Sequence, residues 1–119
     1  MGWEVEYTDE FELWWSELNE SEQVDVSAVV QLLEVKGPQL SFPHSSGING
    51  SVHSHMRELR IQHKGQPYRV LYASDPIRHA LLLLGGNKTG KDDWYEKNVP
   101  MADKLYDEHL KLLKKEGSL

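Results

Sequence analysis

Four basic side chains in the middle of the sequence have spacings that suit chemistry on a phosphate group. Arg60 and Arg69 each fall in a short stretch of alternating residues, on the side opposite to the apolar positions. Lys88 and Lys91 follow a later apolar run that ends in two glycines. If these stretches pair as neighbouring strands, the cations gather over one surface of a sheet.

A set of arginine, lysine, histidine and tyrosine side chains meets the needs of metal-independent RNA cleavage. A base removes the proton of the ribose 2′-hydroxyl, cations stabilise the charge on the pentavalent phosphate, and an acid protonates the leaving 5′-oxygen. Cations that lie close together also lower one another's proton affinity, which brings a lysine or histidine nearer to neutrality. In the alternative interpretation, Arg60 and Arg69 are solvated strand residues paired with Glu58 or Asp75.

The motifs of several other reaction classes are missing from the sequence. It contains no cysteine and no serine in a nucleophile elbow. The segment Gly85–Gly90 resembles a phosphate-binding loop only superficially, because the spacing and the helix directly after it are missing. His53 and His55 could form a metal pair, but no carboxylate pattern or cysteine accompanies them. We therefore expect neither a metal nor a cofactor.

The strands that position the arginines follow from hydrophobic periodicity. Alternating apolar and polar residues predict strands over residues 58–62 and 68–73, joined by a tight turn at residues 63–66. A second turn at residues 74–76 leads to the continuous apolar run of residues 80–84, which predicts a third strand. We expect these three strands to form an antiparallel meander.

Two helices are predicted ahead of the meander, after a strand over residues 3–7. Thr8 or Asp9 caps the first helix, whose apolar stripe consists of Phe11, Trp14, Trp15 and Leu18. Residues 19–21 end that helix and cap a second one, whose stripe consists of Val26, Val29, Val30 and Leu33. A glycine and a proline at residues 37–38 end the second helix. The two helices should form a hairpin that packs across one face of the sheet.

The remaining segments complete an α+β domain. Residues 39–55 lack periodicity and are predicted to be a long loop. A last helix is predicted with Asn98 as its cap, Pro100 in its first turn and Gly117 at its end. The predicted order is β-α-α-β-β-β-α, with the helix hairpin on a small, mainly antiparallel sheet. We expect residues 1–119 to form a single domain.

Charge is distributed unevenly along the chain, whose net charge is −6. Residues 1–52 carry ten acids and one base, whereas residues 53–97 carry eight bases and five acids. Only the second, mildly basic surface need face a polyanion. The absence of cysteine fits a reducing cytosol, and no apolar segment suggests export or membrane insertion, so we expect a cytoplasmic protein.

Three stretches of the sequence resemble a known family of small toxins. They are HMRELRIQHKGQPYRVLYASD, LLLLGGNKTG and WYEKNVPMADKLYDEHL, which together span roughly residues 40–113. They look like the HigB-type branch of the RelE/ParE superfamily of type II toxins, and the predicted order of elements also matches. The resemblance implies a toxin encoded beside a helix-turn-helix antitoxin, which would cut mRNA on the ribosome and reach operator DNA only through the antitoxin complex.

The resemblance also assigns roles to individual residues. Arg69 matches the family arginine that contacts the scissile phosphate, and Arg60 lies on the adjoining strand. Lys88 matches a second catalytic cation, and Tyr95 a late tyrosine that orients or protonates. Further candidate RNA-binding residues are Arg57, His63, Lys64 and Lys91.

Two alternatives to an mRNA endonuclease stay open within the resemblance. The ParE branch shares the fold but inhibits DNA gyrase by binding, without nuclease chemistry. The domain could instead lack catalysis and act only as an antitoxin-binding regulator, which its acidity would suit. We also expect the acidic helix hairpin to take part in antitoxin binding, because ten acids exceed what solubility requires.

Overall fold

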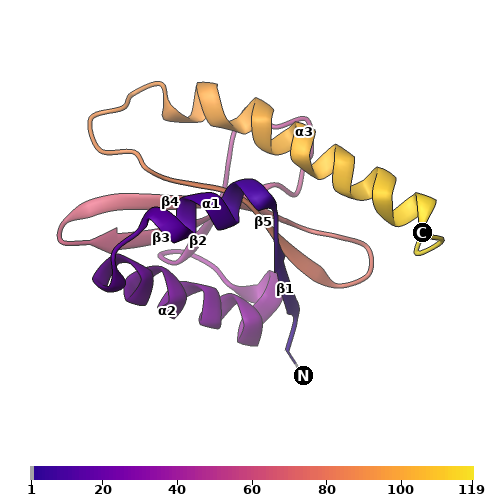
Figure 1. The fold of residues 1–119 in the computed structure, drawn as a ribbon, viewed down its shortest axis with the longest axis horizontal. Coiled ribbons are helices and arrows are strands. Elements are labelled where there is room, and N and C mark those ends of the chain that lie inside the picture. Colours follow the sequence, from indigo (N-terminus) through magenta and orange to yellow (C-terminus); the bar gives the residue numbers. More distant parts are fainter. Residues whose placement is uncertain (1) are drawn as a thin grey trace.

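The chain folds into a five-stranded sheet with helices on both faces (Figure 1). A computed structural model describes residues 2–119. The elements in chain order are β1 (Glu4–Tyr7), α1 (Asp9–Glu17), α2 (Glu20–Lys36), the 3-10 turn η1 (Gly37–Gln39), β2 (Ser45–Gly47), β3 (Arg57–His63), β4 (Gln66–Ser74), β5 (His79–Asn87) and α3 (Trp94–Lys115). Helices α1 and α2 pack on one face of the sheet and α3 on the other, so the predicted α+β class and helix hairpin are confirmed.

The sheet confirms the predicted meander and adds one strand. Its order is β1-β5-β4-β3-β2, and all neighbours are antiparallel except β1, which runs parallel to β5. The prediction that residues 39–55 form only a loop is wrong, because Ser45–Gly47 pairs with β3 as the short edge strand β2. Backbone groups at the edge of β3 need partners, and a three-residue strand is too short to show a period in the sequence.

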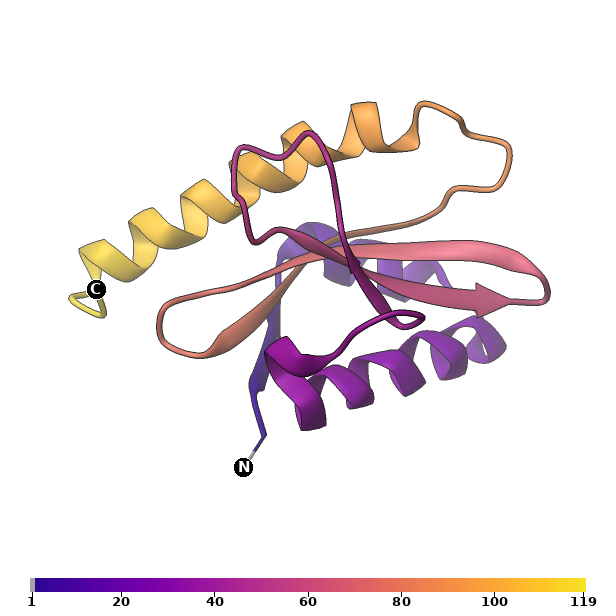
Figure 2. The same ribbon diagram turned by 180° about the vertical axis from the view of Figure 1, so that it is seen from behind.

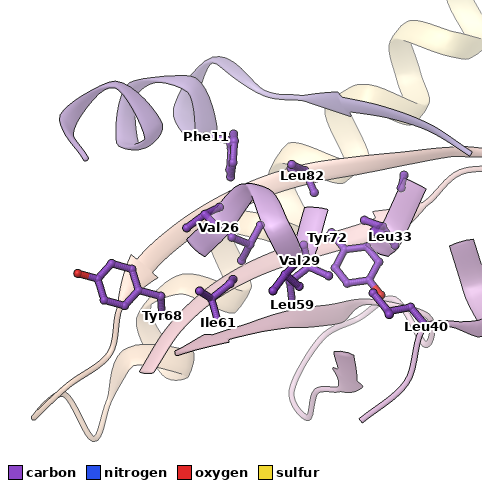
Figure 3. Packing of buried hydrophobic residues seen from close by; sticks show 12 residues of the cluster. Phe11, Val26, Val29, Leu33, Leu40, Leu59, Ile61, Tyr68, Tyr72 and Leu82 are labelled. Carbon is purple, nitrogen blue, oxygen red and sulfur yellow. The ribbon is translucent and has the colours of Figure 1, made fainter. Parts of the chain in front are cut away.

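The helix hairpin is held at its turns by side-chain caps. The Thr8 hydroxyl accepts a hydrogen bond from the Phe11 amide at 3.0 Å. Asn19 and Glu22 form a reciprocal capping box at the start of α2. Gly37, with φ of 53°, ends α2 as predicted and lies where any Cβ would clash with the Trp3 ring. Apolar residues of both helices then meet β3, β4 and β5 in a buried core (Figure 3).

Helix α3 covers the opposite face and begins earlier than predicted. It starts at Trp94, so Asn98 and Pro100 lie inside the helix and the cap assigned to Asn98 is wrong. The Asn98 side chain instead donates to the Trp94 carbonyl at 2.7 Å. Trp94 is buried against Gly86, where a Cβ would come within 2.6 Å of the indole nitrogen. Tertiary packing therefore fixes the start of α3.

No helix within residues 2–119 is long and apolar enough to cross a membrane.

The connection between β2 and β3 rises from the sheet and lies against α3 (Figure 2). Asp103 of α3 holds it, since its carboxylate accepts from the Ser51 hydroxyl at 2.5 Å and from the Val52 amide at 3.0 Å. His53 contacts Asp107 of the same helix at 2.8 Å. The segment is thus tied to α3 rather than free, and its first residues come close to the candidate site.

Candidate active site

The strand register brings the two predicted arginines directly opposite each other. Arg60 of β3 pairs with Arg69 of β4, and Arg69 pairs in turn with Gly86 of β5. All three lie on the sheet face covered by α3, because side chains alternate along each strand and Gly86 faces Trp94. The expectation that the meander gathers cations on one surface is therefore met for Arg60 and Arg69.

A buried carboxylate, Glu58, connects the members of this cluster. Its oxygens accept from the Ser46 hydroxyl at 2.7 Å, the Tyr95 hydroxyl at 2.6 Å and a terminal nitrogen of Arg60 at 3.2 Å. Nε of Arg69 lies 3.4 Å from the same carboxylate. Four elements, β2, β3, β4 and α3, thus meet at one side chain whose exposed fraction is only 5%.

The two arginines differ in their access to solvent. The Arg69 side chain is 5% exposed, and one terminal nitrogen donates to the Tyr68 carbonyl at 3.0 Å. Its Nε makes an ion pair with Glu58 but has no hydrogen-bond partner among the described residues. The Arg60 side chain is 29% exposed and its guanidinium lies 5.0 Å from the centre of the Phe42 ring. Arg60 therefore offers the outward charge, and Arg69 the buried one.

Lys88 in the β5–α3 connection and Tyr95 at the start of α3 complete the cluster. Burial and the hydrogen bond to Glu58 raise the pKa of Tyr95 above its usual value, with a smaller opposing effect of Arg69. The phenol is therefore protonated at neutral pH and can donate a proton or hydrogen bond. The Lys88 ammonium lies 5.4 Å from the centre of the Tyr95 ring. The four residues assigned to catalysis by the resemblance are thus close to one another.

A cavity of about 240 Å³ opens beside this cluster. Glu58 and Tyr95 line it from the sheet and α3, and residues 47–49 line it from the start of the β2–β3 connection. A substrate group in this cavity would contact the carboxylate and the phenol together, with Arg60 and Lys88 nearby. The lining carries one carboxylate and one phenol, which can exchange a proton, and the cations lie around these two groups rather than in the lining itself.

The structure places the other candidate RNA-binding residues outside this cluster. Arg57 points to the opposite sheet face, where its Nε donates to the Ser45 hydroxyl at 3.0 Å. His63 is buried on that same face and contacts Asp25 of α2 at 2.6 Å. Lys64 lies in the β3–β4 turn, and Lys91 in the exposed β5–α3 connection.

The histidine pair at residues 53 and 55 takes part in packing against α3. His53 contacts Asp107, and His55 contacts the Tyr106 hydroxyl at 3.0 Å. Within the described part of the chain, no group of three or more histidine and acidic residues is arranged to hold a metal ion.

Glu58 and Ser46 are the members of the cluster that the sequence did not single out as functional. Glu58 entered only as a possible ion-pair partner, and it does pair with both arginines, whereas Asp75 lies elsewhere, bonded to His109. The sequence did contain a sign that Glu58 belongs to the site, because Glu58 and Arg60 are two residues apart on one strand and so share a face. Ser46 gave no signal, since β2 itself was not predicted.

Solved structures define the class of fold. A variant of the E. coli toxin RelE in the free state superposes with a TM-score of 0.57 at 11% identity, over 81% of this chain and 94% of that one. The archaeal RelE of a RelE-RelB complex from Pyrococcus horikoshii superposes with a TM-score of 0.55 at 14% identity, over 76% of this chain and 99% of that one. The fold is RelE-like.

Sequence comparisons then give the family. The chain belongs to the phage-derived Gp49-like family (DUF891), whose sequence profile matches residues 13–107. It is 42% identical over 93 residues to the Mycobacterium tuberculosis protein named "Putative toxin HigB3", covering 77% of this chain and 80% of that protein. It is 35% identical over 112 residues to "Putative toxin HigB2" of the same organism, covering 92% of this chain but only 55% of the relative. The chain is thus HigB-like in sequence and RelE-like in fold.

Proposed function

We propose that this protein is a toxin that cuts mRNA on the ribosome without a metal, with residues 1–119 acting as a single domain. The observation that carries the proposal is the cluster around Glu58, in which two arginines and a tyrosine converge on one buried carboxylate beside a cavity. A base, an acid and cations are thus available within one site, as phosphodiester cleavage by the 2′-hydroxyl requires.

Each step of that reaction has a residue suited to it. Glu58, which as a carboxylate only accepts hydrogen bonds, takes the proton of the 2′-hydroxyl as the 2′-oxygen attacks phosphorus. Arg60, Arg69 and Lys88 stabilise the added charge on the phosphate. Tyr95 donates its proton to the leaving 5′-oxygen. When Glu58 takes up a proton it loses the negative charge that disfavours ionisation of the Tyr95 phenol. Proton uptake by Glu58 therefore favours proton donation by Tyr95.

A cognate antitoxin is the proposed partner that keeps the toxin inactive. The structural neighbour from Pyrococcus horikoshii is a RelE-RelB complex, and this chain shares the fold of the RelE protein in it. We infer that a helix-turn-helix antitoxin binds this protein and that operator DNA is contacted only through the resulting complex. Ribosome and mRNA are the other proposed partners.

Replacing one arginine tests the proposal in cells. Arg69→Ala should lower the cleavage rate by on the order of 100- to 1000-fold, because a charged stabiliser of the transition state is lost, and should abolish growth arrest on induction. Arg78→Ala is the matched control, since it removes an equal charge from an exposed residue in the β4–β5 turn. The measurement is growth together with pulse-labelled protein and DNA synthesis.

The same labelling separates the competing functions. Translation that halts before replication supports the nuclease, whereas replication that halts first would indicate a gyrase inhibitor of the ParE type. Growth arrest that is equally strong with Arg69→Ala and Arg78→Ala would contradict the assigned site.

A further inference from the structure

The outward face of α2 is hollowed along almost its whole length. Three adjoining hollows, of about 400, 440 and 570 Å³, follow the helix from Glu20 to Val35, and the first lies between α2, α1 and β1. The first two share Trp15 and Ser27, and the second and third share Gln31. At 1.5 Å per residue the row is about 22 Å long, which matches about four turns of a helix laid against it.

Apolar side chains line this groove without being covered. Tyr7, Val24 and Val35 are 56%, 60% and 74% exposed. Val30 and the Trp15 ring, both half-buried, form part of the floor. An uncovered apolar row of this length on a small protein is typical of an interaction surface.

The rim of the groove is acidic. Glu12, Glu20 and Glu34 line it. Lys36 is the only lysine or arginine within residues 1–52, against ten acids. A segment that fills the groove must therefore present apolar side chains to its floor and positive charges to its rim.

We propose that this groove is the docking site for a basic amphipathic helix of a partner protein. Helix-in-groove binding of this kind uses apolar anchors three and four residues apart on the bound helix. The lysines or arginines of the partner pair with the glutamates of the rim, which speeds association and fixes its direction. The site does not depend on nuclease chemistry, because it lies on the sheet face opposite to Glu58, Arg60 and Arg69.

A synthetic peptide serves as the probe. It is a fluorescein-labelled amphipathic helix of about 16 residues, with leucines on one face and lysines on the other, and its control carries glutamates in place of the lysines. Binding to the whole protein is followed by fluorescence anisotropy, and the contacted residues by amide chemical shifts. We expect the lysine peptide alone to bind, with shifts confined to α1, α2 and β1.

Matched variants separate the groove from the net charge. The double variant Glu12→Lys and Glu34→Lys reverses two groove charges and should weaken binding by at least about tenfold, because like charges then face each other. The double variant Glu108→Lys and Glu116→Lys changes the net charge equally at two exposed positions, one in α3 and one just after its end, and should stay within about twofold of the native protein.

A third variant tests the apolar floor. Val24→Ser alters a side chain that is already exposed, so it should fold normally and still weaken binding several-fold. The proposal would be overturned if the two double variants lost affinity equally. It would also be overturned if either the Glu12→Lys and Glu34→Lys double variant or Val24→Ser bound the peptide as tightly as the native protein, or if the chemical-shift changes centred on the cluster around Glu58.

Discussion

At the scale of single residues, the site depends on a carboxylate buried between cations. Removing Glu58 and Arg69 from water carries a large desolvation cost, which is offset only if every donor and acceptor finds a partner. Glu58 accepts three hydrogen bonds, whereas Nε of Arg69 only forms an ion pair with it and has no hydrogen-bond partner among the described residues. Because a buried N–H without a hydrogen bond is costly, its presence here supports the role proposed for Arg69.

The variant Glu58→Gln should lower cleavage by on the order of 100-fold or more, since it keeps the shape of the side chain but removes the proposed base. It should also lower the pKa of Tyr95 toward its usual value. The sign follows from the causes of the shift: the carboxylate disfavours ionisation of the phenol, so its loss favours the phenolate, while burial still keeps the pKa raised.

The tyrosinate absorbance of Glu58→Gln, compared with the native protein and with Tyr95→Phe, measures that change. A Tyr95 titration at the same pH in native protein and variant would show that the two groups are not coupled. Cleavage at the native rate would remove Glu58 from the mechanism.

At the scale of elements, the site is assembled from segments that are distant in sequence. The strand β2 supplies Ser46, β3 and β4 supply the charges, and α3 supplies Tyr95. The β2–β3 connection closes the cavity and is fastened to α3 through Asp103. Its attachment should therefore affect both stability and activity.

Replacing Asp103 with alanine should cost about 2–3 kcal/mol of unfolding free energy, because two hydrogen bonds to a buried carboxylate are lost. Cleavage should fall as well, because residues 47–49 then lose their fixed place beside Tyr95. Asp107→Ala is the matched control: its carboxylate is half exposed and bonds only His53, so its cost should be roughly 0–1 kcal/mol. Urea denaturation measures both, and equal losses would show that the connection does not depend on Asp103.

The elements that were predictable from sequence are those with a long, regular pattern. The meander follows from the alternation around Leu59 and Val70, and the register that joins Arg60 to Arg69 follows from the short turn between their strands. The helix hairpin follows from Thr8 and Asn19, whose side chains form local caps.

What escaped prediction depends on contacts between distant segments. The strand β2 exists because β3 offers it an edge, and α3 begins at Trp94 because that indole packs on Gly86. The roles of Glu58 and Ser46 likewise appear only when β2, β3 and α3 meet. A local pattern carries no record of such contacts.

At the scale of the whole molecule, the helix hairpin and the candidate site lie on opposite faces of the sheet; Figure 1 shows α1 and α2 on one face and α3 on the other. The acidic helices α1 and α2 cover one face, and the arginines of the candidate site lie on the other. Under the two proposals, a protein with a net charge of −6 presents its arginines to RNA on one face and attracts a basic partner to the other.

The chemistry of the RNA ends produced by the protein tests the central claim most directly. Transcripts cleaved on induction, and free RNA cleaved in the presence of a chelator, should carry 2′,3′-cyclic phosphates or the 3′-phosphates formed from them, because the 2′-oxygen is the nucleophile in the proposed mechanism. The same ends should be missing with Arg69→Ala and present with Arg78→Ala. Cleaved RNA with 3′-hydroxyl ends, or cleavage of free RNA that stops when the chelator is added, would contradict a metal-independent site built around Glu58.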